Sequence, residues 1–336
     1  MIRKYLTPYK LGKPILTGSG ISGAFDELAV DCPFVFYHHN RFYMMYVGFD
    51  GTGYQTGLAV SDDLITWERK GPILKREEHV GWDRIGAAGT WILKESNSLW
   101  DLPTLKKVDG KYWMVYHSYP EEGYEAGPAQ IGLAWTEDEE LMDWHRLPEP
   151  VFSWQDGADW ENGGLYKACL LEEDGRYYLF YNAKDQKPRG WQEQIGVAIS
   201  TDLKHWERYE NNPIVKVASG RWDSQFCADP YVVKDGERWV MYYYGFNRRH
   251  AQDGIAFSDD LFNWEKHPDP ILPNGDPGEL DHSFAHKPAL LYHDGVLYHF
   301  YCACRKYKPG DPVKSLWDEF RTITFAASQP INQAEE

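Results

Sequence analysis

The chain has 336 residues, of which 43% are hydrophobic, and its formal net charge is -16 at pH 7. So negative a chain is not expected to bind nucleic acid or an anionic membrane surface. Its first residues, MIRKYLTPYK, lack the apolar core of a signal peptide, and no later segment is apolar over a membrane-spanning length. The five cysteines have no metal-ligand spacing, and we interpret them as reduced thiols of a cytoplasmic protein.

Five segments in which aromatic and β-branched residues alternate around a tight turn predict five β-hairpins, because Asp-Gly and His-Asn turns connect antiparallel strands. No segment of the chain has a convincing helical period. In chain order the predicted hairpins are FVFYHHNRFYMMYVG (34–48), TLKKVDGKYWMVYHS (104–118), CLLEEDGRYYLFYNA (169–183), YVVKDGERWVMYYYG (231–245) and ALLYHDGVLYHFYCA (289–303).

A second phrase follows each hairpin: an apolar strand, then Ser or Thr with acidic residues, then a Trp. Five copies at a spacing of roughly 60 residues are typical of the blades of a β-propeller. The copies are TGLAVSDDLITWERKGPIL (56–74), IGLAWTEDEELMDWHRLPEPV (131–151), IGVAISTDLKHWERYENNPIV (195–215), DGIAFSDDLFNWEKHPDPIL (253–272) and the truncated ITFAASQP (323–330).

We therefore predict an all-β protein whose residues 1–336 form a single five-bladed β-propeller domain. The blades are expected at about 24–80, 81–155, 156–218, 219–275 and 276–330. The fifth copy lacks its outer strand, and the segment KPILTG (13–18) resembles the PIL and PIV endings of the other copies. We expect this N-terminal segment to close the ring.

The first strand of each blade lines the central channel of a propeller, so equivalent positions on these strands converge on one funnel. A Pro near the start of most first strands aligns them. An acid seven residues before the Pro recurs, which favours a structural role in capping turns or tying blades together. These recurring acids are Asp26, Glu161, Asp223 and Asp281, with Asp83 in the second blade.

The layer of residues next to the Pro differs from blade to blade. Symmetry that is broken only at the funnel is typical of a functional site on a repeated scaffold. Two places before the Pro, or before Ala168 in the third blade, stand Asp31, Asp101, Tyr166, Ala228 and His286, and one place before it stand Cys32, Leu102, Lys167, Asp229 and Lys287.

Converging carboxylates among Trp and Tyr side chains suit the cleavage of a glycosidic bond. One carboxylate activates water or attacks the sugar, a second acid protonates the leaving oxygen, and aromatic faces stack on sugar rings. The predicted catalytic residues are Asp31, Asp101, Asp229 and His286, and the predicted substrate contacts are Trp100, Glu161, Tyr166, Lys167, Arg248 and Lys287.

Asp31 before Pro33, Asp101 before Pro103 and the repeated phrase S-D-D-L-x-x-W resemble the five-bladed glycoside hydrolases of families 43, 62, 32, 68, 117 and 130. The resemblance to family 43 implies that Asp31 is the general base and that Asp101 orients the acid. The Glu that serves as the acid in that family is replaced here by Tyr166. The similarity to family 117 implies His286 as the acid, whereas the similarity to the family 130 phosphorylases implies a phosphate beside Lys167.

Several expectations follow from this layer. The four predicted catalytic residues should lie in one funnel, and Asp31→Asn should abolish turnover while the fold stays intact. Nearby carboxylates are expected to raise the pKa of His286 and keep it charged at neutral pH.

The loops between the second and third strands of blades three to five are rich in basic residues, which is unexpected in so acidic a chain. Two interpretations stay open: solvated loop charges, or a half-rim that binds a uronate, sulfate or phosphate group of the substrate. The residues of this half-rim are Lys184, Lys187, Arg189, Arg248, Arg249, His250, Arg305 and Lys306.

We predict a glycoside hydrolase that cleaves a terminal bond of an oligosaccharide. Whether this substrate bears an anionic group stays open. A phosphorylase of the same fold and a non-catalytic sugar-binding propeller are the alternatives. No cofactor is required by any motif, although the inner acids could supply oxygen ligands to a structural divalent cation in the channel. The oligomeric state is not indicated by the sequence.

Overall fold

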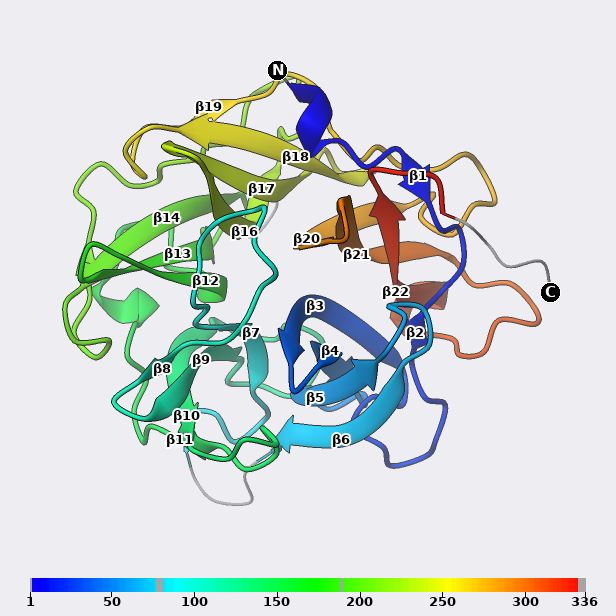
Figure 1. Ribbon diagram of the computed structural model, residues 1–336, viewed down its shortest axis with the longest axis horizontal. Coiled ribbons are helices and arrows are strands. Elements are labelled where there is room, and N and C mark those ends of the chain that lie inside the picture. Colours follow the sequence, from blue (N-terminus) through cyan, green and yellow to red (C-terminus); the bar gives the residue numbers. More distant parts are fainter. Residues whose placement is uncertain (1, 77–80, 188–189, 332–336) are drawn as a thin grey trace.

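A computed structural model describes residues 2–76, 81–187 and 190–331 of the chain. Within these residues the strands form five antiparallel blades around a central axis (Figure 1). Single parallel pairs, Glu193 with Phe226 and Ala251 with Phe284, join blades three to five into one continuous sheet. The helical segments are three short 3-10 helices, η1 (Ile2–Tyr5), η2 (Trp154–Asp156) and η3 (Leu316–Asp318). In the described part of the chain, no helix has the length and apolar character needed to cross a membrane. The all-β five-bladed propeller is thus confirmed.

Each blade runs from an inner strand at the axis to a short outer strand at the rim. The first blade contains β3 (Ala29–His38), β4 (Arg41–Phe49), β5 (Tyr54–Ser61) and β6 (Glu68–Leu74). The second contains β7 (Ala88–Ile92), β8 (Lys107–Val108), β9 (Lys111–Ser118), β10 (Gln130–Thr136) and β11 (His145–Arg146). The third contains β12 (Leu165–Glu173), β13 (Arg176–Lys184), β14 (Glu193–Ser200) and β15 (Glu207–Arg208).

The fourth blade contains β16 (Phe226–Asp235), β17 (Arg238–Phe246), β18 (Ala251–Ser258) and β19 (Glu265–Lys266). The fifth contains β20 (Phe284–His293), β21 (Val296–Lys306) and β22 (Glu319–Ala327). Its outer edge comes from the start of the chain, because β1 (Tyr9–Lys10) and β2 (Leu16–Thr17) both pair antiparallel with β22. The predicted closure of the ring by the N-terminal segment is confirmed (Figure 1).

The hairpin turns adopt the backbone that their residues favour. Asp109 and Gly110 both have positive φ, at 51° and 77°, and Asp174 and Gly175 repeat this at 51° and 72°. Consecutive left-handed residues form the type I′ turn, whose twist matches that of the flanking strands. The inner strands are buried on both faces by neighbouring blades, so their sequences read as continuous apolar runs.

The five recurring acids tie the blades together. In each blade the acid accepts a hydrogen bond from a cation on the outer strand, as Asp26 does from Arg69 at 3.1 Å. The same cation donates to a backbone carbonyl at the end of the preceding blade. These second contacts are Arg69 to Thr17, Arg146 to Lys75, Arg208 to Ser153, Lys266 to Lys216 and Lys10 to Pro273. The predicted role of these acids in tying neighbouring blades is confirmed.

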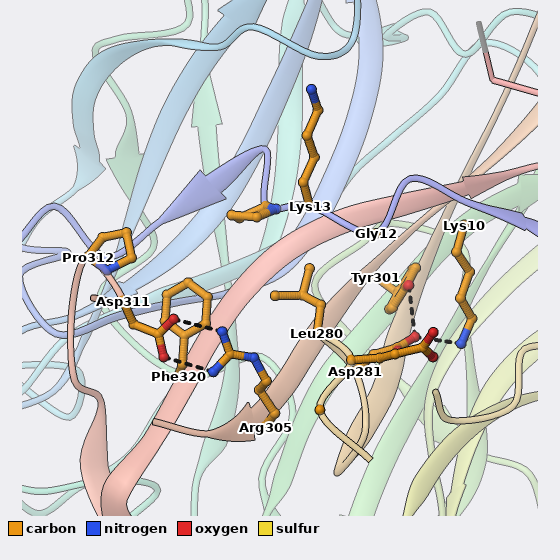
Figure 2. Close-up of a pocket in the computed structure, with 13 residues that line it drawn as sticks. Lys10, Gly12, Lys13, Leu280, Asp281, Tyr301, Arg305, Asp311, Pro312 and Phe320 are labelled. Atoms are coloured by element: carbon orange, nitrogen blue, oxygen red, sulfur yellow. Dashed lines mark hydrogen bonds and ion pairs between the residues drawn. The ribbon is translucent and has the colours of Figure 1, made fainter. Parts of the chain in front are cut away.

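Lys10 provides the tie that closes the ring, because its ammonium lies 2.6 Å from the Asp281 carboxylate (Figure 2). We expect Lys10→Met to lower the free energy of unfolding by roughly 2–3 kcal/mol, since Asp281 stays buried and loses its cation. Chemical denaturation should be compared with Lys13→Met, a nearby lysine that lines the same hollow and has no acidic partner among the described residues. Equal stability of the two variants would contradict the role of Lys10.

The channel is closed at one end. Phe34, Trp91 and Tyr231 of three different blades meet there, with ring centroids 4.9 Å and 4.6 Å apart. Residues 93–105 follow β7 and cross the axis beneath this packing, where Leu99 donates its backbone N–H to Lys234 at the end of β16 (Figure 1). The channel therefore forms a pocket that opens at the other end, at the starts of the inner strands.

Candidate active site

A bulge lies at the start of the inner strand in all five blades. The pairing register shifts between Asp31 and Phe34 in β3, and at the equivalent places in β7, β12, β16 and β20. At four of these bulges, all but that of β7, one residue other than glycine adopts a left-handed backbone that ordinary side chains rarely take. These residues are Cys32 (φ 48°), Lys167 (φ 41°), Asp229 (φ 54°) and Lys287 (φ 66°). Bulges and left-handed residues re-aim side chains and concentrate at functional sites, which locates the site at this ring.

The second blade departs from the predicted alignment of the repeats. Ala88 pairs with His117 in the way that Asp31 pairs with Val47, so Ala88 and Gly89 take the positions predicted for Asp101 and Leu102. The long insertion of this blade follows the inner strand, whereas the alignment of the repeats placed it before that strand. Blade two therefore contributes almost no side chain to the ring.

Asp101 lies at the closed end of the channel, in the crossing segment, where its carboxylate accepts a hydrogen bond from Ser96. Its neighbour Trp100 donates to Asp235 at the end of β16. Asp235 lies six positions after Asp229 along the extended strand β16, a distance of roughly 20 Å. The predictions that Asp101 and Trp100 belong to the funnel are wrong.

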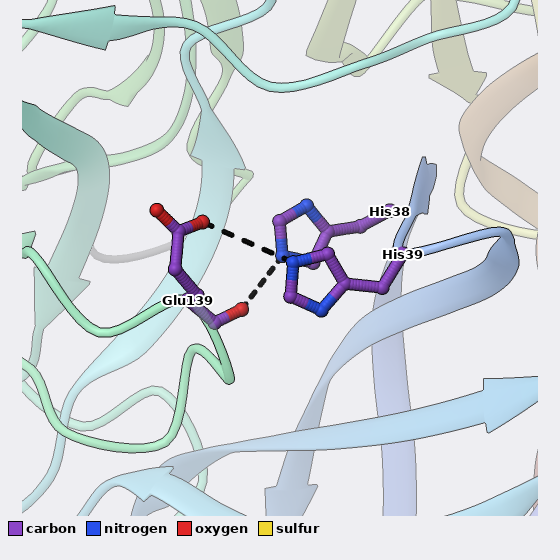
Figure 3. Close-up of side chains that lie close together, drawn as sticks. All are labelled: His38, His39 and Glu139. Carbon is purple, nitrogen blue, oxygen red and sulfur yellow. Dashed lines mark hydrogen bonds and ion pairs between the residues drawn. The ribbon is translucent and has the colours of Figure 1, made fainter.

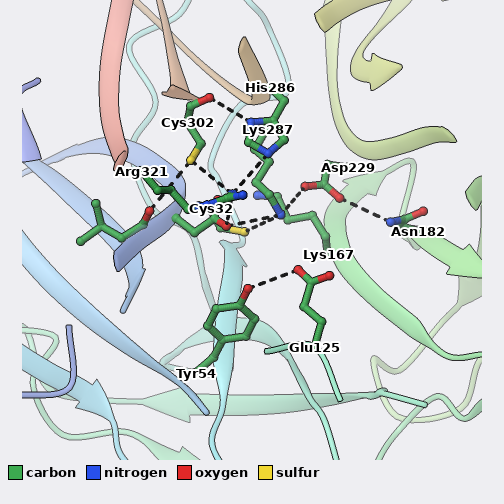
Figure 4. A network of polar contacts seen from close by, with 12 residues as sticks. Cys32, Tyr54, Glu125, Lys167, Asn182, Asp229, His286, Lys287, Cys302 and Arg321 are labelled. Carbon is green, nitrogen blue, oxygen red and sulfur yellow. Dashed lines mark hydrogen bonds and ion pairs between the residues drawn. The ribbon is translucent and has the colours of Figure 1, made fainter. Parts of the chain in front are cut away.

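A buried network of opposite charges joins the blades at the base of the funnel (Figure 4). The Lys287 ammonium lies 3.7 Å from Asp31 and 3.4 Å from Asp229, and Arg321 donates to Asp31 at 3.1 Å. Burial by itself raises the pKa of Asp31, but the Lys287 and Arg321 cations lower it well below its usual range. Asp31, Asp229 and His286 are thus brought together, as predicted.

Asp229 differs from Asp31 although both face Lys287. Burial raises the pKa of Asp229, and the Lys287 and Lys167 cations do not fully offset this effect. One of its carboxylate oxygens has no hydrogen-bond partner among the described residues. The two carboxylates are therefore held in different ways, Asp31 firmly ionised and Asp229 less so.

His286 does not carry the charge predicted for it. Burial and the nearby Arg321 and Lys287 cations lower its pKa to about 3, which outweighs the attraction of Asp31. Its Nδ1 lies 2.9 Å from the Cys302 carbonyl, which can only accept, so this nitrogen holds the proton. Its Nε2 accepts from Arg321 at 3.4 Å. A neutral ring with this tautomer has no proton to give a substrate from Nε2, so the prediction of a charged His286 is wrong.

Two glutamates that the alignment of the repeats missed lie at the mouth of the funnel. Glu193, at the start of β14, accepts hydrogen bonds from Asn182 and from Trp191, both at 3.1 Å. Glu125 lies in the loop between β9 and β10 and accepts from Tyr54 at 3.2 Å. Burial, followed by the charge of Glu125, raises the pKa of Glu193 to about 7. A carboxyl group with this pKa is suited to donate a proton near neutral pH.

A sequence signal for Glu193 exists in the repeat itself. The third strands of four blades begin with a variable residue followed by Q-x-G, as in YQTG, AQIG, EQIG and AQDG, and the fifth blade has RTIT. The variable residues of β5, β14, β18 and β22 occupy equivalent places in the pairing with the neighbouring strand, and that of the second blade directly precedes β10. They are Tyr54, Ala129, Glu193, Ala251 and Arg321. Glu125 stands on a loop outside the repeat, which gives it no such signal.

Two pockets are both lined by Glu125 and Glu193. The inner cavity has a volume of about 20 Å³, enough for a water-sized group. The outer pocket is much larger, at about 500 Å³. The described residues lining the inner cavity include Tyr166, Lys167, Asp229 and Lys287 but not Asp31 or His286, and those lining the outer pocket include Tyr124, Lys184, Lys187, Trp191 and Trp317.

His117 is a further polar group of the inner cavity. Burial and nearby lysines lower its pKa to about 3, so the ring is neutral. The backbone N–H of Lys167 donates to its Nδ1 at 3.3 Å, which leaves the ring proton on Nε2. His117 can therefore donate a hydrogen bond from Nε2.

The remaining predicted contacts lie elsewhere. Glu161 serves the interblade tie through Arg208, and Arg248 is exposed at the rim, where it donates to Gln225. Three residues of the half-rim pair with acids of their own loops: Lys187 with Asp185, Arg305 with Asp311 and Lys306 with Asp318. Arg189 lies outside the described residues.

Among the described residues, one group of three side chains could hold a metal ion: His38, His39 and Glu139 (Figure 3). This group lies at the β3–β4 turn, at the far end of β3 from Asp31. In the funnel, Lys287 and Arg321 already stand beside the acids that would supply oxygen ligands. A divalent cation in the channel stays a prediction.

Carboxylates that converge with aromatic side chains at the open end of a five-bladed propeller define a carbohydrate-active enzyme. Comparison with known proteins agrees. Residues 92–279, more than half of the chain, match the family described as the glycosyl hydrolases family 32 N-terminal domain. The chain belongs to this family.

Three known proteins are similar to this chain in sequence or in structure. A solved structure of BT0996, described as an RGII complex, superposes with a TM-score of 0.83 and 29% sequence identity, over 100% of this chain and 95% of that protein's chain. The β-1,2-mannobiose phosphorylase of Thermoanaerobacter sp. (strain X514) is 28% identical over 133 residues, 35% of this chain and only 43% of that protein's length. The 1,2-β-oligomannan phosphorylase of the same organism is 24% identical over 269 residues, 79% of this chain and 80% of the relative. Another solved structure, described as a glycoside hydrolase, superposes with a TM-score of 0.82 and 28% sequence identity, over 100% of this chain and 96% of that protein's chain. Proteins described as hydrolases and as phosphorylases are therefore both similar to this chain.

Proposed function

We propose that this protein is a glycoside hydrolase that cleaves the terminal bond of an oligosaccharide bearing an anionic group. The observation that carries the proposal is the position of Glu193, a carboxyl group with a pKa of about 7, beside Glu125 where the two pockets meet. Glycosidases need one protonated carboxyl and one ionised carboxylate on either side of the bond they break. Glu193 is the proposed acid and Glu125 the proposed second carboxylate.

The proposed reaction uses these two groups in the usual way. Glu193 gives its proton to the leaving oxygen as the bond from that oxygen to the anomeric carbon breaks. The oxygen of a water molecule bonds to the anomeric carbon, and the proton that water releases returns to a carboxylate. Asp31 is less suited to a direct role, because its oxygens accept hydrogen bonds from the backbone N–H of Cys32 and from the Arg321 guanidinium.

Charge balance favours water over phosphate as the acceptor. A phosphate with two negative charges would need several free cations, and here Lys287 and Arg321 both face carboxylates. Within the described residues, Lys167 is the cation of the inner cavity that has no ion-pair partner. In the outer pocket, the cation without an ion-pair partner among these residues is Lys184. Single free lysines suit a monoanionic group such as a uronate carboxylate. The closed end of the channel favours a chain end over an internal bond.

The proposal is tested by screening aryl-glycosides and uronate-bearing oligosaccharides in phosphate-free buffer and in excess inorganic phosphate. We expect a free reducing sugar as product, at a rate that added phosphate does not change. A sugar 1-phosphate formed only when phosphate is present would establish a phosphorylase instead.

Lys167→Met should weaken the binding of an anionic substrate. Loss of a charged hydrogen bond is expected to raise KM roughly tenfold or more for a uronate-bearing substrate, with a much smaller effect on its neutral counterpart. Lys204→Met is the control, because that exposed lysine lies beyond the far end of β14 from Glu193 and lines neither pocket. Equal changes in KM for the charged and neutral substrates would rule out recognition of the anionic group by Lys167.

A further inference from the structure

The hairpin turn of blade one differs from the turns of the other blades. Blades two, three and five turn on Asp-Gly, with both residues in the left-handed region. Blade one turns on His39 and Asn40 instead, whose φ angles are 46° and 60°. Left-handed residues other than Gly cost free energy and are concentrated at functional sites. Successive side chains of a strand point to opposite faces, but at this turn the rings of His38 and His39 stack, with centroids 4.0 Å apart.

The repeated acidic phrase differs in the neighbouring blade. In blades one, three and four it reads S-x-D-L, whereas in blade two it reads T-E-D-E-E-L, with Glu139 and Glu140 inserted before Leu141. The Leu is the common point of the alignment, because the Trp three residues later donates its Nε1–H to the carbonyl of Leu64 in blade one and of Leu141 in blade two. The two glutamates are therefore additions that the other copies of the phrase do not contain.

These two departures from the repeat meet in space (Figure 3). The Nε2 atom of His38 lies 2.7 Å from the backbone carbonyl of Glu139, and the Nε2 atom of His39 lies 3.9 Å from the Glu139 carboxylate. One ligand atom from each of these three residues lies within 4.8 Å of the other two. The Glu140 carboxylate lies 3.9 Å from Nδ1 of His39, the place of an acid that holds the second ring nitrogen of a metal-bound histidine.

Neighbouring side chains hold these ligand atoms in place. Tyr43 and Tyr112 make edge-to-face contacts with the His38 ring, at centroid distances of 5.5 Å and 5.8 Å. Tyr112 also donates to Oε2 of Glu139 at 2.9 Å, and the Lys107 ammonium donates to Oε1 at 2.5 Å. Lys107 thus occupies one carboxylate oxygen, and the oxygen that faces the histidine rings is Oε2. Ligands oriented in this way by their neighbours are typical of metal sites.

We propose that His38, His39 and Glu139 form a zinc site that joins blade one to blade two. Imidazole nitrogen and carboxylate oxygen are usual ligands of zinc, and water supplies the fourth ligand where the protein provides three. Each neutral ring would coordinate through Nε2 with its proton on Nδ1. His38 is half-buried, whereas His39 and Glu139 are exposed, so the ion can enter from solvent.

The position of the site gives it a structural role. Blades three to five form one continuous sheet, whereas blades one and two are separate sheets in the described part of the chain. A zinc ion at this position would link two blades that no strand pairing joins there. The group lies at the far end of β3 from Asp31, so we expect neither zinc nor a chelator to change turnover. The proposal is therefore independent of the proposed hydrolase function.

The test measures zinc binding to the chelator-treated protein by isothermal titration calorimetry and by thermal unfolding. We expect one zinc ion to bind per chain and the Tm to rise by a few degrees when zinc is in about 100-fold excess over its Kd. Calcium, which prefers a shell of oxygen ligands, should leave the Tm unchanged. The absence of saturable zinc binding, or equal stabilisation by calcium, would overturn the site.

Two variants locate the bound ion. His39→Asn removes an imidazole with a residue that tolerates the left-handed backbone, and Glu139→Gln keeps the length of the side chain. Each should weaken zinc binding roughly tenfold or more. His293→Asn is the matched control, because His293 precedes the turn of blade five and faces Asp294 at 3.2 Å. It should bind zinc as the unmodified protein does. Unchanged affinity in both site variants, or an equal loss in the control, would contradict the assignment.

Discussion

Glu193→Gln is expected to lower kcat on a natural disaccharide by roughly 10²- to 10⁴-fold, because Gln keeps the shape of the side chain and has no proton to give. The loss should be much smaller on a nitrophenyl glycoside, whose leaving group needs little protonation. Initial rates on both substrates measure the effect. Equal losses on the two substrates would show that Glu193 is not the acid.

The pH dependence of kcat provides an independent check. Glu193 must be protonated to act as an acid, so the rate should fall as the pH rises above about 7, the pKa to which burial raises this group. This alkaline limb should vanish in Glu193→Gln. Because the pKa of Glu193 is raised in the folded state, protonation of this group favours folding. Its contribution to the free energy of unfolding is complete below the ordinary pKa of a glutamate and is lost as the pH rises to about 7. Glu193→Gln should therefore be more stable than the unmodified protein in mildly alkaline buffer.

Asp31→Asn is expected to lower the free energy of unfolding by roughly 3–5 kcal/mol at pH 7, because it removes a buried anion that faces both Lys287 and Arg321. The pKa of Asp31 is lowered in the folded state, so its stabilisation is present above its usual pKa and is lost as the pH falls through the folded-state value. Urea denaturation at pH 7 and in acid measures both effects.

Asp229→Asn is the matched control for this variant. Asp229 faces the same lysine at 3.4 Å, but burial raises its pKa, so its charge contributes less to the folded state. We expect a clearly smaller loss of stability than for Asp31→Asn. The catalytic role that the sequence predicts for Asp31 is checked in the same experiments by measuring turnover of the folded fraction. A stable Asp31→Asn variant without turnover would restore Asp31 as the base.

The repeat made the architecture predictable from sequence. Asp-Gly turns, period-two strands and the S-D-D-L-x-x-W phrase are local signals, and each depends on residues close together in the chain. The acid at Asp26 and its equivalents was also readable, because a role that every blade needs appears in every blade. The ring of Cys32, Lys167, Asp229 and Lys287 was likewise predictable, because equivalent positions on the inner strands converge at the axis.

Sequence alone failed where the repeat is interrupted or where charges interact across blades. The insertion in blade two could be placed before or after its inner strand, and the choice moved Asp101 from the funnel to the closed end of the channel. Glu125 was missed because it lies on a loop outside the repeat.

The sequence by itself determined the five-bladed ring, its closure by the N-terminal segment and the strand ends at which a site could form, because these follow from short-range patterns that recur. Only the tertiary structure decided which of the converging groups are charged. Burial and neighbouring cations from other blades make His286 neutral, hold Asp31 ionised and leave Glu193 with a pKa of about 7. Such shifts depend on desolvation and on distances between residues as far apart in the chain as Asp31 and Arg321, and neither quantity is encoded in a local pattern.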